Sequence, residues 1–132
     1  MLQATTQKKV EKKGGDQKKS ASQRIRLHVP GTVLGHRRSK RKQHHNTTLL
    51  SIEGVRTKEE ARWYLGKRVA YVYKAPTKRR TMSGKETNLR VVWGRLMRTH
   101  GSIGVVRAKF SIDLPPAAYG KPVKVMLYPS NI

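Results

Sequence analysis

The sequence contains no cysteine and few of the residues that build a large core. The absence of Cys excludes disulfide bonds, thiolate metal sites and cysteine nucleophiles. Aromatic residues make up 6% and hydrophobic residues 36% of the 132 residues, below the roughly 45–50% apolar content of typical globular domains, so we expect a single economical core. No run approaches the roughly 18 apolar residues of a membrane-spanning helix, and no apolar signal core is present, so we expect an intracellular protein without membrane contact.

Acidic residues are scarce as well, whereas basic residues are abundant. The chain has 30 Lys and Arg against 7 Asp and Glu, which gives a net charge of +23. Ordinary solubility needs a net charge of only about 2 to 8 in magnitude. The excess destabilises the compact state by self-repulsion, and an extended polyanion that releases condensed counterions compensates for this cost. The composition therefore favours nucleic acid as the partner.

The first 23 residues differ in composition from the remainder of the chain. They mix lysines with Gln, Ser, Thr and Gly, and they have too little apolar surface to offset the entropy of ordering. We expect residues 1–23 to be a basic, flexible N-terminal extension that is disordered in the free protein. Polar and apolar residues alternate from Arg24 to Val29, so we expect the folded, nucleic-acid-binding domain to comprise residues 24–132.

Short segments rich in alternating, β-branched or aromatic residues predict an all-β fold. Pro30 and Gly31 are typical of a turn, and Thr57 with Glu60 forms a capping box that predicts one short helix before Gly66. Six or seven short strands with turns between them indicate a small barrel. The predicted strands span residues 24–29, 32–35, 49–52, 67–74, 89–97, 105–110 and 123–128.

Two segments that carry much of the charge have almost no apolar side chains. Residues 37–45 predict a projecting loop or strand end, and residues 75–85 predict a second basic loop. A β-rich body with two basic loops, without zinc-finger ligands or helix-turn-helix spacing, favours a folded RNA over DNA. His44 and His45 either bind bases and phosphates or are simply solvated. The candidate contacts in these loops are Arg37, Arg38, Lys40, Arg41, Lys42, His44, His45, Lys78, Arg79 and Arg80.

The strand pattern separates core residues from contact residues. Alternation in residues 105–110 places Val106 and Phe110 on one face and Arg107 and Lys109 on the other. Rigidly held Arg side chains can grip phosphates bidentately with less loss of entropy than a flexible tail. We therefore expect strand cations, which also include Arg90 and Arg98, to contribute more per residue than the tail.

The aromatic residues are expected to lie mainly in the core. A domain with so few hydrophobic residues can hardly expose most of them, although the same rings could serve as base-stacking platforms. Trp63 and Tyr119 are the residues most expected to be exposed. The rings weighed between core and base stacking are Trp63, Trp93, Tyr71, Tyr73 and Phe110, and most of them are assigned to the core.

The sequence lacks the parts of an active site. Residues 84–87 resemble a phosphate-binding loop only faintly, because Glu86 stands where a hydroxyl residue is required. His100 has no accompanying nucleophile or convincing acid. We predict a protein that is not an enzyme and has no cofactor, no metal and no small-molecule substrate. An RNA-modifying enzyme that uses His100 is the weakest alternative.

Several ordered blocks closely resemble one protein family. These blocks are residues 49–55, 64–73, 98–101, 104–110 and 126–132. They resemble the large-subunit ribosomal protein family thirty-five-A of archaea and eukaryotes, and the similarity runs from about Arg24 to the last residue. The resemblance implies a small closed six-stranded β-barrel of the type shared with translation-factor domains, embedded in ribosomal RNA, and it implies no catalysis.

The resemblance also assigns contact residues and partners. Matching motifs carry over Arg68, Arg107 and Lys109, and the segment from Arg37 to Asn46 matches in character and partly in sequence. The matching block at the end of one strand adds Arg98, Thr99 and His100.

The implied protein is a structural constituent of the large cytosolic ribosomal subunit that passes through the nucleus and nucleolus. Its implied partners are ribosomal RNA and neighbouring ribosomal proteins, without homo-oligomers. A packaging protein that binds nucleic acid regardless of sequence is the alternative that the composition leaves open.

Overall fold

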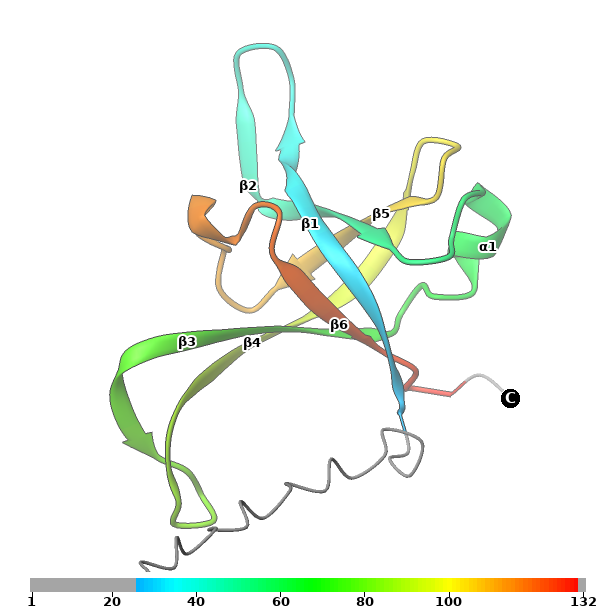
Figure 1. Cartoon of the computed structure of the whole chain (residues 1–132). Coiled ribbons are helices and arrows are strands. Elements are labelled where there is room, and N and C mark those ends of the chain that lie inside the picture. Colours follow the sequence, from blue (N-terminus) through cyan, green and yellow to red (C-terminus); the bar gives the residue numbers. More distant parts are fainter. Residues whose placement is uncertain (1–25, 131–132) are drawn as a thin grey trace, which may run out of the picture.

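A computed structural model describes residues 26–130 and consists of six strands with two short helices (Figure 1). The predicted N-terminal extension, residues 1–23, lies outside the described residues. Within them, no helix has the length and apolar character needed to cross a membrane. The strands are β1 (His28–Arg38), β2 (Gln43–Ile52), β3 (Arg68–Arg80), β4 (Glu86–His100), β5 (Val105–Phe110) and β6 (Pro122–Met126), and the helices are α1 (Lys58–Arg62) and η2 (Pro116–Ala118).

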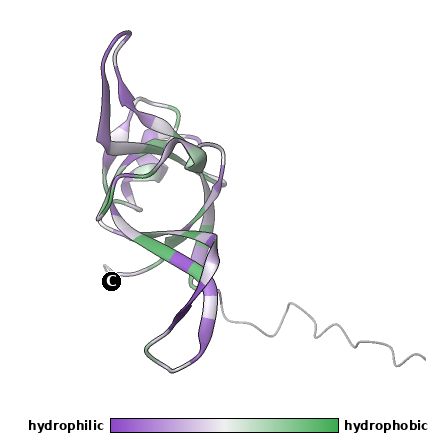
Figure 2. Cartoon of the chain, turned by 90° about the vertical axis from the view of Figure 1, so that its left-hand side faces the viewer, coloured by the Kyte–Doolittle hydropathy of each residue, from purple (hydrophilic) through white to green (hydrophobic). Residues whose placement is uncertain are grey.

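The six strands form a closed antiparallel barrel in the order β1-β2-β5-β4-β3-β6, which Figure 2 shows nearly end-on. Pairing of β6 with both β1 and β3 closes the sheet, and this confirms the predicted six-stranded barrel. Directly opposed residues of neighbouring strands point to the same side, so the apolar residues of all strands meet inside. The buried core includes Val33, Leu50, Ile52, Val69, Leu96, Val106, Ala108, Phe110, Val123 and Val125.

The prediction of a turn at Pro30 and Gly31 is wrong, because both residues lie within β1. Gly31 is opposite residues of β2 and β6, and both strands approach it closely. A Cβ atom there would lie 3.0 Å from the Ser51 carbonyl oxygen and 3.2 Å from Val123 Cγ2. The glycine therefore permits close strand packing, while the Pro30 carbonyl accepts a hydrogen bond from the Glu53 backbone N–H.

The basic segment near residue 40 is the tip of a projecting hairpin. We call residues 37–46 the first arm; they comprise the end of β1, a short connection and the start of β2. Arg37 lies opposite His44, and Arg38 lies opposite Gln43, so strand pairing continues close to the tip. The sequence expectation of a projecting segment is confirmed (Figure 1).

The second basic segment is mostly strand, and its prediction as a loop is wrong. β3 extends to Arg80 and β4 begins at Glu86, so the two strands continue as a two-stranded ribbon beyond the barrel. Pro76 lies where the register shifts between Lys74 and Arg79, so its missing N–H removes no regular ladder bond. We call residues 75–89 the second arm. The two arms project from opposite sides of the barrel (Figures 1 and 2).

The predicted helix cap is present at α1. Thr57 Oγ1 accepts a hydrogen bond from the Glu60 N–H at 3.3 Å, and the Glu60 carboxylate accepts one from the Arg56 N–H at 2.9 Å. The helix ends at Arg62, earlier than predicted, and turns lead to Gly66 with a φ of +84°. Ala61 anchors this short helix in the core. The capping interactions thus confirm the helix and its start.

Gly94 is the position at which the barrel is least able to accept a side chain. A Cβ atom there would lie 2.7 Å from the Lys109 carbonyl oxygen and 2.8 Å from Phe110 Cδ1. Gly94→Ala should lower the free energy of unfolding by about 1–3 kcal/mol, because backbone and core ring must both shift. Chemical denaturation measures this change. Leu89→Ala, at an exposed position of the same strand, is the control and should change stability by less than about 0.5 kcal/mol; equal effects of the two substitutions would contradict the close-packing account.

Candidate nucleic-acid interface

Three cations stand side by side on the outer face of the barrel. Arg68 of β3 lies opposite Arg95 of β4, which lies opposite Lys109 of β5. All three side chains are exposed, whereas their strand neighbours Val69 and Phe110 are buried in the core. Like charges directly opposite one another destabilise a sheet, so this first cationic row has an electrostatic cost in the free protein. Arg68 and Lys109 were predicted contacts, but the sequence alone did not single out Arg95.

A second cationic row follows on two of these strands, β4 and β5. After a shift in register, Arg98 of β4 lies opposite Arg107 of β5. The Arg107 Nε–H donates a hydrogen bond of 2.9 Å to His100 Nδ1. Because a guanidinium group can only donate, Nδ1 of His100 is the acceptor, and the imidazole fixes the orientation of Arg107. Thr99 is half-buried opposite Val106, so it lies on the inner side of the strand.

The first arm presents a dense set of cations to solvent. Arg37 is half-buried, and the other predicted contacts are exposed: Arg38, Lys40, Arg41, Lys42, His44, His45 and Asn46. The ring of His45 contacts that of His36 edge-on, with ring centroids 5.1 Å apart. Of the two predicted histidines, His45 therefore packs against His36 at the base of the first arm, while His44 is exposed to solvent.

His36 is a structural residue that the sequence did not reveal. It is only 3% exposed, with Nε2 3.1 Å from the Leu114 carbonyl oxygen and Nδ1 3.3 Å from Thr48 Oγ1. Its ring also packs edge-on against Tyr119. A register shift between Val33 and Gly35 turns His36 inward, and simple alternation gives no sign of that shift. These contacts fix the base of the first arm to the segment that precedes η2.

The second arm carries exposed Lys78, Arg79 and Arg80 near its tip. Arg90, at its base, is half-buried and donates from Nη2 to Thr77 Oγ1 at 2.7 Å. Its Nε is buried without a partner among the described residues. Arg90 is therefore partly occupied in holding the arm together, whereas the three tip residues are free to meet a ligand.

Not every cation is available at the surface. Lys67 is only 1% exposed, and its Nζ donates to the Pro129 carbonyl oxygen at 2.5 Å. The same ammonium group lies 4.8 Å from the centroid of the Trp63 ring. The next residue continues this connection, since the Arg68 N–H donates to the Tyr128 carbonyl oxygen. Lys67 thus holds the C-terminal segment against the start of β3.

Two aromatic residues predicted for the core are instead on the surface. Trp93 is 44% exposed and Tyr73 is 37% exposed, so the core assignment is wrong for both. Trp93 points outward because its neighbours Val92 and Gly94 occupy the inner positions of β4, where Gly94 makes room for Phe110. Tyr71 and Phe110 are buried as predicted, and the predicted exposure of Trp63 and Tyr119 is confirmed.

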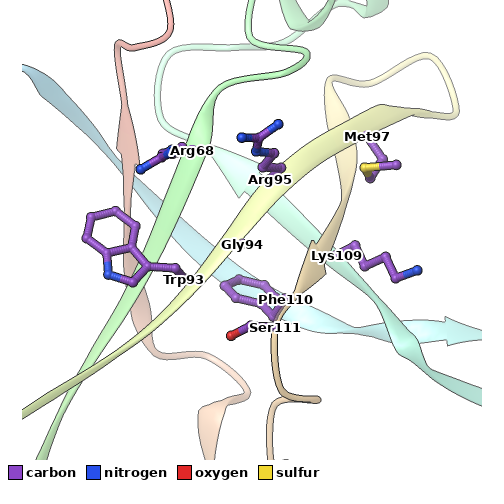
Figure 3. A pocket seen from close by; sticks show the side chains of 8 residues that line it. All are labelled: Arg68, Trp93, Gly94, Arg95, Met97, Lys109, Phe110 and Ser111. Atoms are coloured by element: carbon purple, nitrogen blue, oxygen red, sulfur yellow. The ribbon is translucent and has the colours of Figure 1, made fainter.

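The first cationic row borders a pocket of about 640 Å³ (Figure 3). The Trp93 indole lies on one side of it, and Met97 and Lys109 lie on the other. Arg68 and Arg95 line a further edge, and the Ser111 hydroxyl lies near the Phe110 ring. An apolar ring and three cations therefore share one opening on the barrel surface.

The exposed cations of the two rows and the two arms are binding groups for an anion. In residues 26–130, no three His, Cys, Asp or Glu side chains are grouped so that they could hold a metal ion. His100, the one candidate base, accepts a hydrogen bond from Arg107. The arrangement suits electrostatic recognition of a polyanion.

Comparison with known proteins identifies the family. Residues 27–126 match the family described as Ribosomal protein L35Ae. The chain is 48% identical over 107 residues to the large ribosomal subunit protein eL33 of Candida albicans, covering 81% of this chain and 95% of that protein. It is 48% identical over 108 residues to eL33 of Caenorhabditis elegans, covering 81% and 87%, and 46% identical over 107 residues to eL33 of Dictyostelium discoideum, covering 81% and 98%. The chain therefore belongs to the ribosomal protein L35Ae family.

Proposed function

We propose that this protein is a structural constituent of the large ribosomal subunit that binds and stabilises folded ribosomal RNA. The observation that carries the proposal is the first cationic row, Arg68, Arg95 and Lys109, on three adjacent strands. Neighbouring strands are about 4.8 Å apart, so the three charges repel one another unless an anion lies across them. Phosphate groups of an RNA strand provide that anion and accept bidentate hydrogen bonds from Arg.

The barrel and the two arms have different tasks in this proposal. The rigid barrel holds the two cationic rows at fixed positions, so phosphates bind there with little loss of side-chain entropy. The arms extend from opposite sides of the barrel (Figure 2), so they reach RNA segments that are not adjacent to the barrel face. Lys78, Arg79 and Arg80 on one arm and the basic tip of the other neutralise these segments. One small protein thus links several parts of a folded RNA.

Partners and location follow from the same proposal. The protein works in the cytosolic ribosome, beside neighbouring large-subunit proteins, after passing through the nucleus and nucleolus for assembly. The basic run at residues 37–42 serves nuclear import before it binds RNA. The chain belongs to a ribosomal protein family rather than to an enzyme family, and His100 acts by orienting Arg107.

Sedimentation of cell extracts tests the proposed function. The tagged full-length protein should co-sediment with large ribosomal subunits at one copy per particle and should remain bound in moderate salt. A packaging protein would instead follow chromatin or bulk nucleic acid in variable amounts. Absence from ribosomal particles would overturn the proposal.

Neutralising the first cationic row should affect RNA binding and stability in opposite directions. The triple variant Arg68→Gln, Arg95→Gln, Lys109→Gln should lower the slope of log affinity against log salt by about 2 to 3, because three phosphate contacts are lost. It should also unfold at a higher temperature than the wild type, because each opposed pair of like charges costs roughly 0.2–1 kcal/mol. Filter binding to large-subunit RNA and calorimetry measure the two effects.

The matched control replaces Arg56, Lys58 and Arg62 by Gln, since these cations flank the acidic first turn of α1. This control should leave the salt slope nearly unchanged. A triple-row variant that binds RNA with wild-type affinity and salt slope would contradict the assignment of the row.

Removing His100 tests its positioning role. His100→Ala leaves the Arg107 guanidinium without its acceptor, and affinity for large-subunit RNA should fall by about 2- to 10-fold, as expected for one hydrogen bond. His100→Asn keeps an acceptor oxygen near the position of Nδ1 and should restore most of the affinity. Equal losses in both variants would show that His100 does not act through Arg107.

A further inference from the structure

The outer face of β4 exposes apolar side chains in a protein that has few of them. Leu89, Val91, Trp93 and Met97 all lie on this face, and Met97 is 59% exposed. A contiguous exposed apolar surface marks an interaction site more often than single exposed residues do. Arg95 stands between Trp93 and Met97, so the apolar stripe is directly continuous with the first cationic row.

The pocket at this junction combines two kinds of recognition. It is an open surface hollow of about 640 Å³ rather than an enclosed cavity. Figure 3 shows the flat Trp93 indole at one side, Arg68 and Arg95 along one edge, and the Lys109 side chain at the side opposite Trp93. A ligand that fits must therefore present a flat apolar ring and an anionic group within the same small span.

We infer that this pocket binds one unpaired nucleotide of the RNA, with its base stacked on Trp93 and its phosphate on the first cationic row. The inference rests on the proposed function, and it specifies the kind of RNA that this face recognises. Stacking on an aromatic ring requires a base that has left the helical stack, so the pocket selects a single-stranded or bulged position rather than a duplex. The polarisable Met97 thioether supplies further apolar contact at the other side.

The charges around the pocket favour RNA over an acidic peptide. The second cationic row, Arg98 and Arg107, continues on the same strands beyond Met97. A chain of phosphates that leaves the pocket therefore meets cations at its next positions, and each phosphate can accept the bidentate hydrogen bonds of an Arg side chain. An extended polyanion with one base turned toward the protein fits the whole face.

Two RNA probes separate base stacking from charge neutralisation. The probes are a ten-nucleotide oligoadenylate single strand and a ten-base-pair RNA duplex, each titrated against the full-length protein. Trp93→Leu keeps an apolar side chain but removes the ring, and it should weaken binding of the single strand by about 5- to 100-fold. Binding of the duplex should change little, and the salt slope should remain that of the wild type because no phosphate contact is lost. Trp93→Phe should recover much of the single-strand affinity.

Matched controls identify the source of any change. Trp63→Phe alters the other tryptophan, keeps an aromatic ring over Lys67 and should bind both probes as the wild type does. In this background Trp93 is the only tryptophan, and its fluorescence should be quenched by the single strand but not by the duplex. Arg95→Gln should weaken both probes and lower the salt slope by about one.

The outcomes distinguish this inference from the proposed function. If the wild type binds RNA but Trp93→Leu binds the single strand equally well, the nucleotide pocket is overturned while the proposed function stands. If the wild type binds neither probe nor ribosomal RNA, the proposed function itself fails. If Trp93 is quenched only when ribosomal proteins are added, the face is a protein contact and the inference is overturned.

Discussion

Repulsion between cations held in fixed register on adjacent strands is the constraint on which the whole arrangement depends. Strand pairing in a closed barrel sets the spacing of the backbone positions from which its outward side chains extend. Arg68, Arg95 and Lys109 are therefore close neighbours in the free protein. The fold tolerates this cost because the functional state includes a polyanion, and the same rigidity that causes the repulsion gives phosphates a preformed site.

An economical core makes such a rigid surface possible. Mostly aliphatic residues fill the barrel, and Gly94 lets the Phe110 ring occupy space that a second side chain would block. Polar residues fix the remaining parts: His36 fastens the first arm, and Lys67 holds the C-terminal segment. With few apolar residues needed inside, Trp93 and Met97 remain on the outer face beside the cations. A small part of the chain's residues thus builds the buried scaffold, and a large part forms the binding surface.

The barrel, the capped helix and the inward and outward faces of β5 could be predicted from alternation and turn signals, because these patterns are local. The extension of β3 and β4 into the second arm could not be predicted in this way. Its residues are polar, and they form strands because the two segments pair with each other. The inward turn of His36 and the alignment of Arg95 depend on register shifts and barrel closure, which are non-local. Trp93 was misassigned because hydrophobicity alone does not show that Gly94 takes the inner position.

A density map of the large ribosomal subunit with this chain traced in it tests the central claim most directly. The account predicts RNA phosphates within hydrogen-bonding distance of the Arg68, Arg95 and Lys109 side chains, bridging β3, β4 and β5. A map in which this row faces open solvent, or an acidic protein surface instead of RNA, would contradict the account.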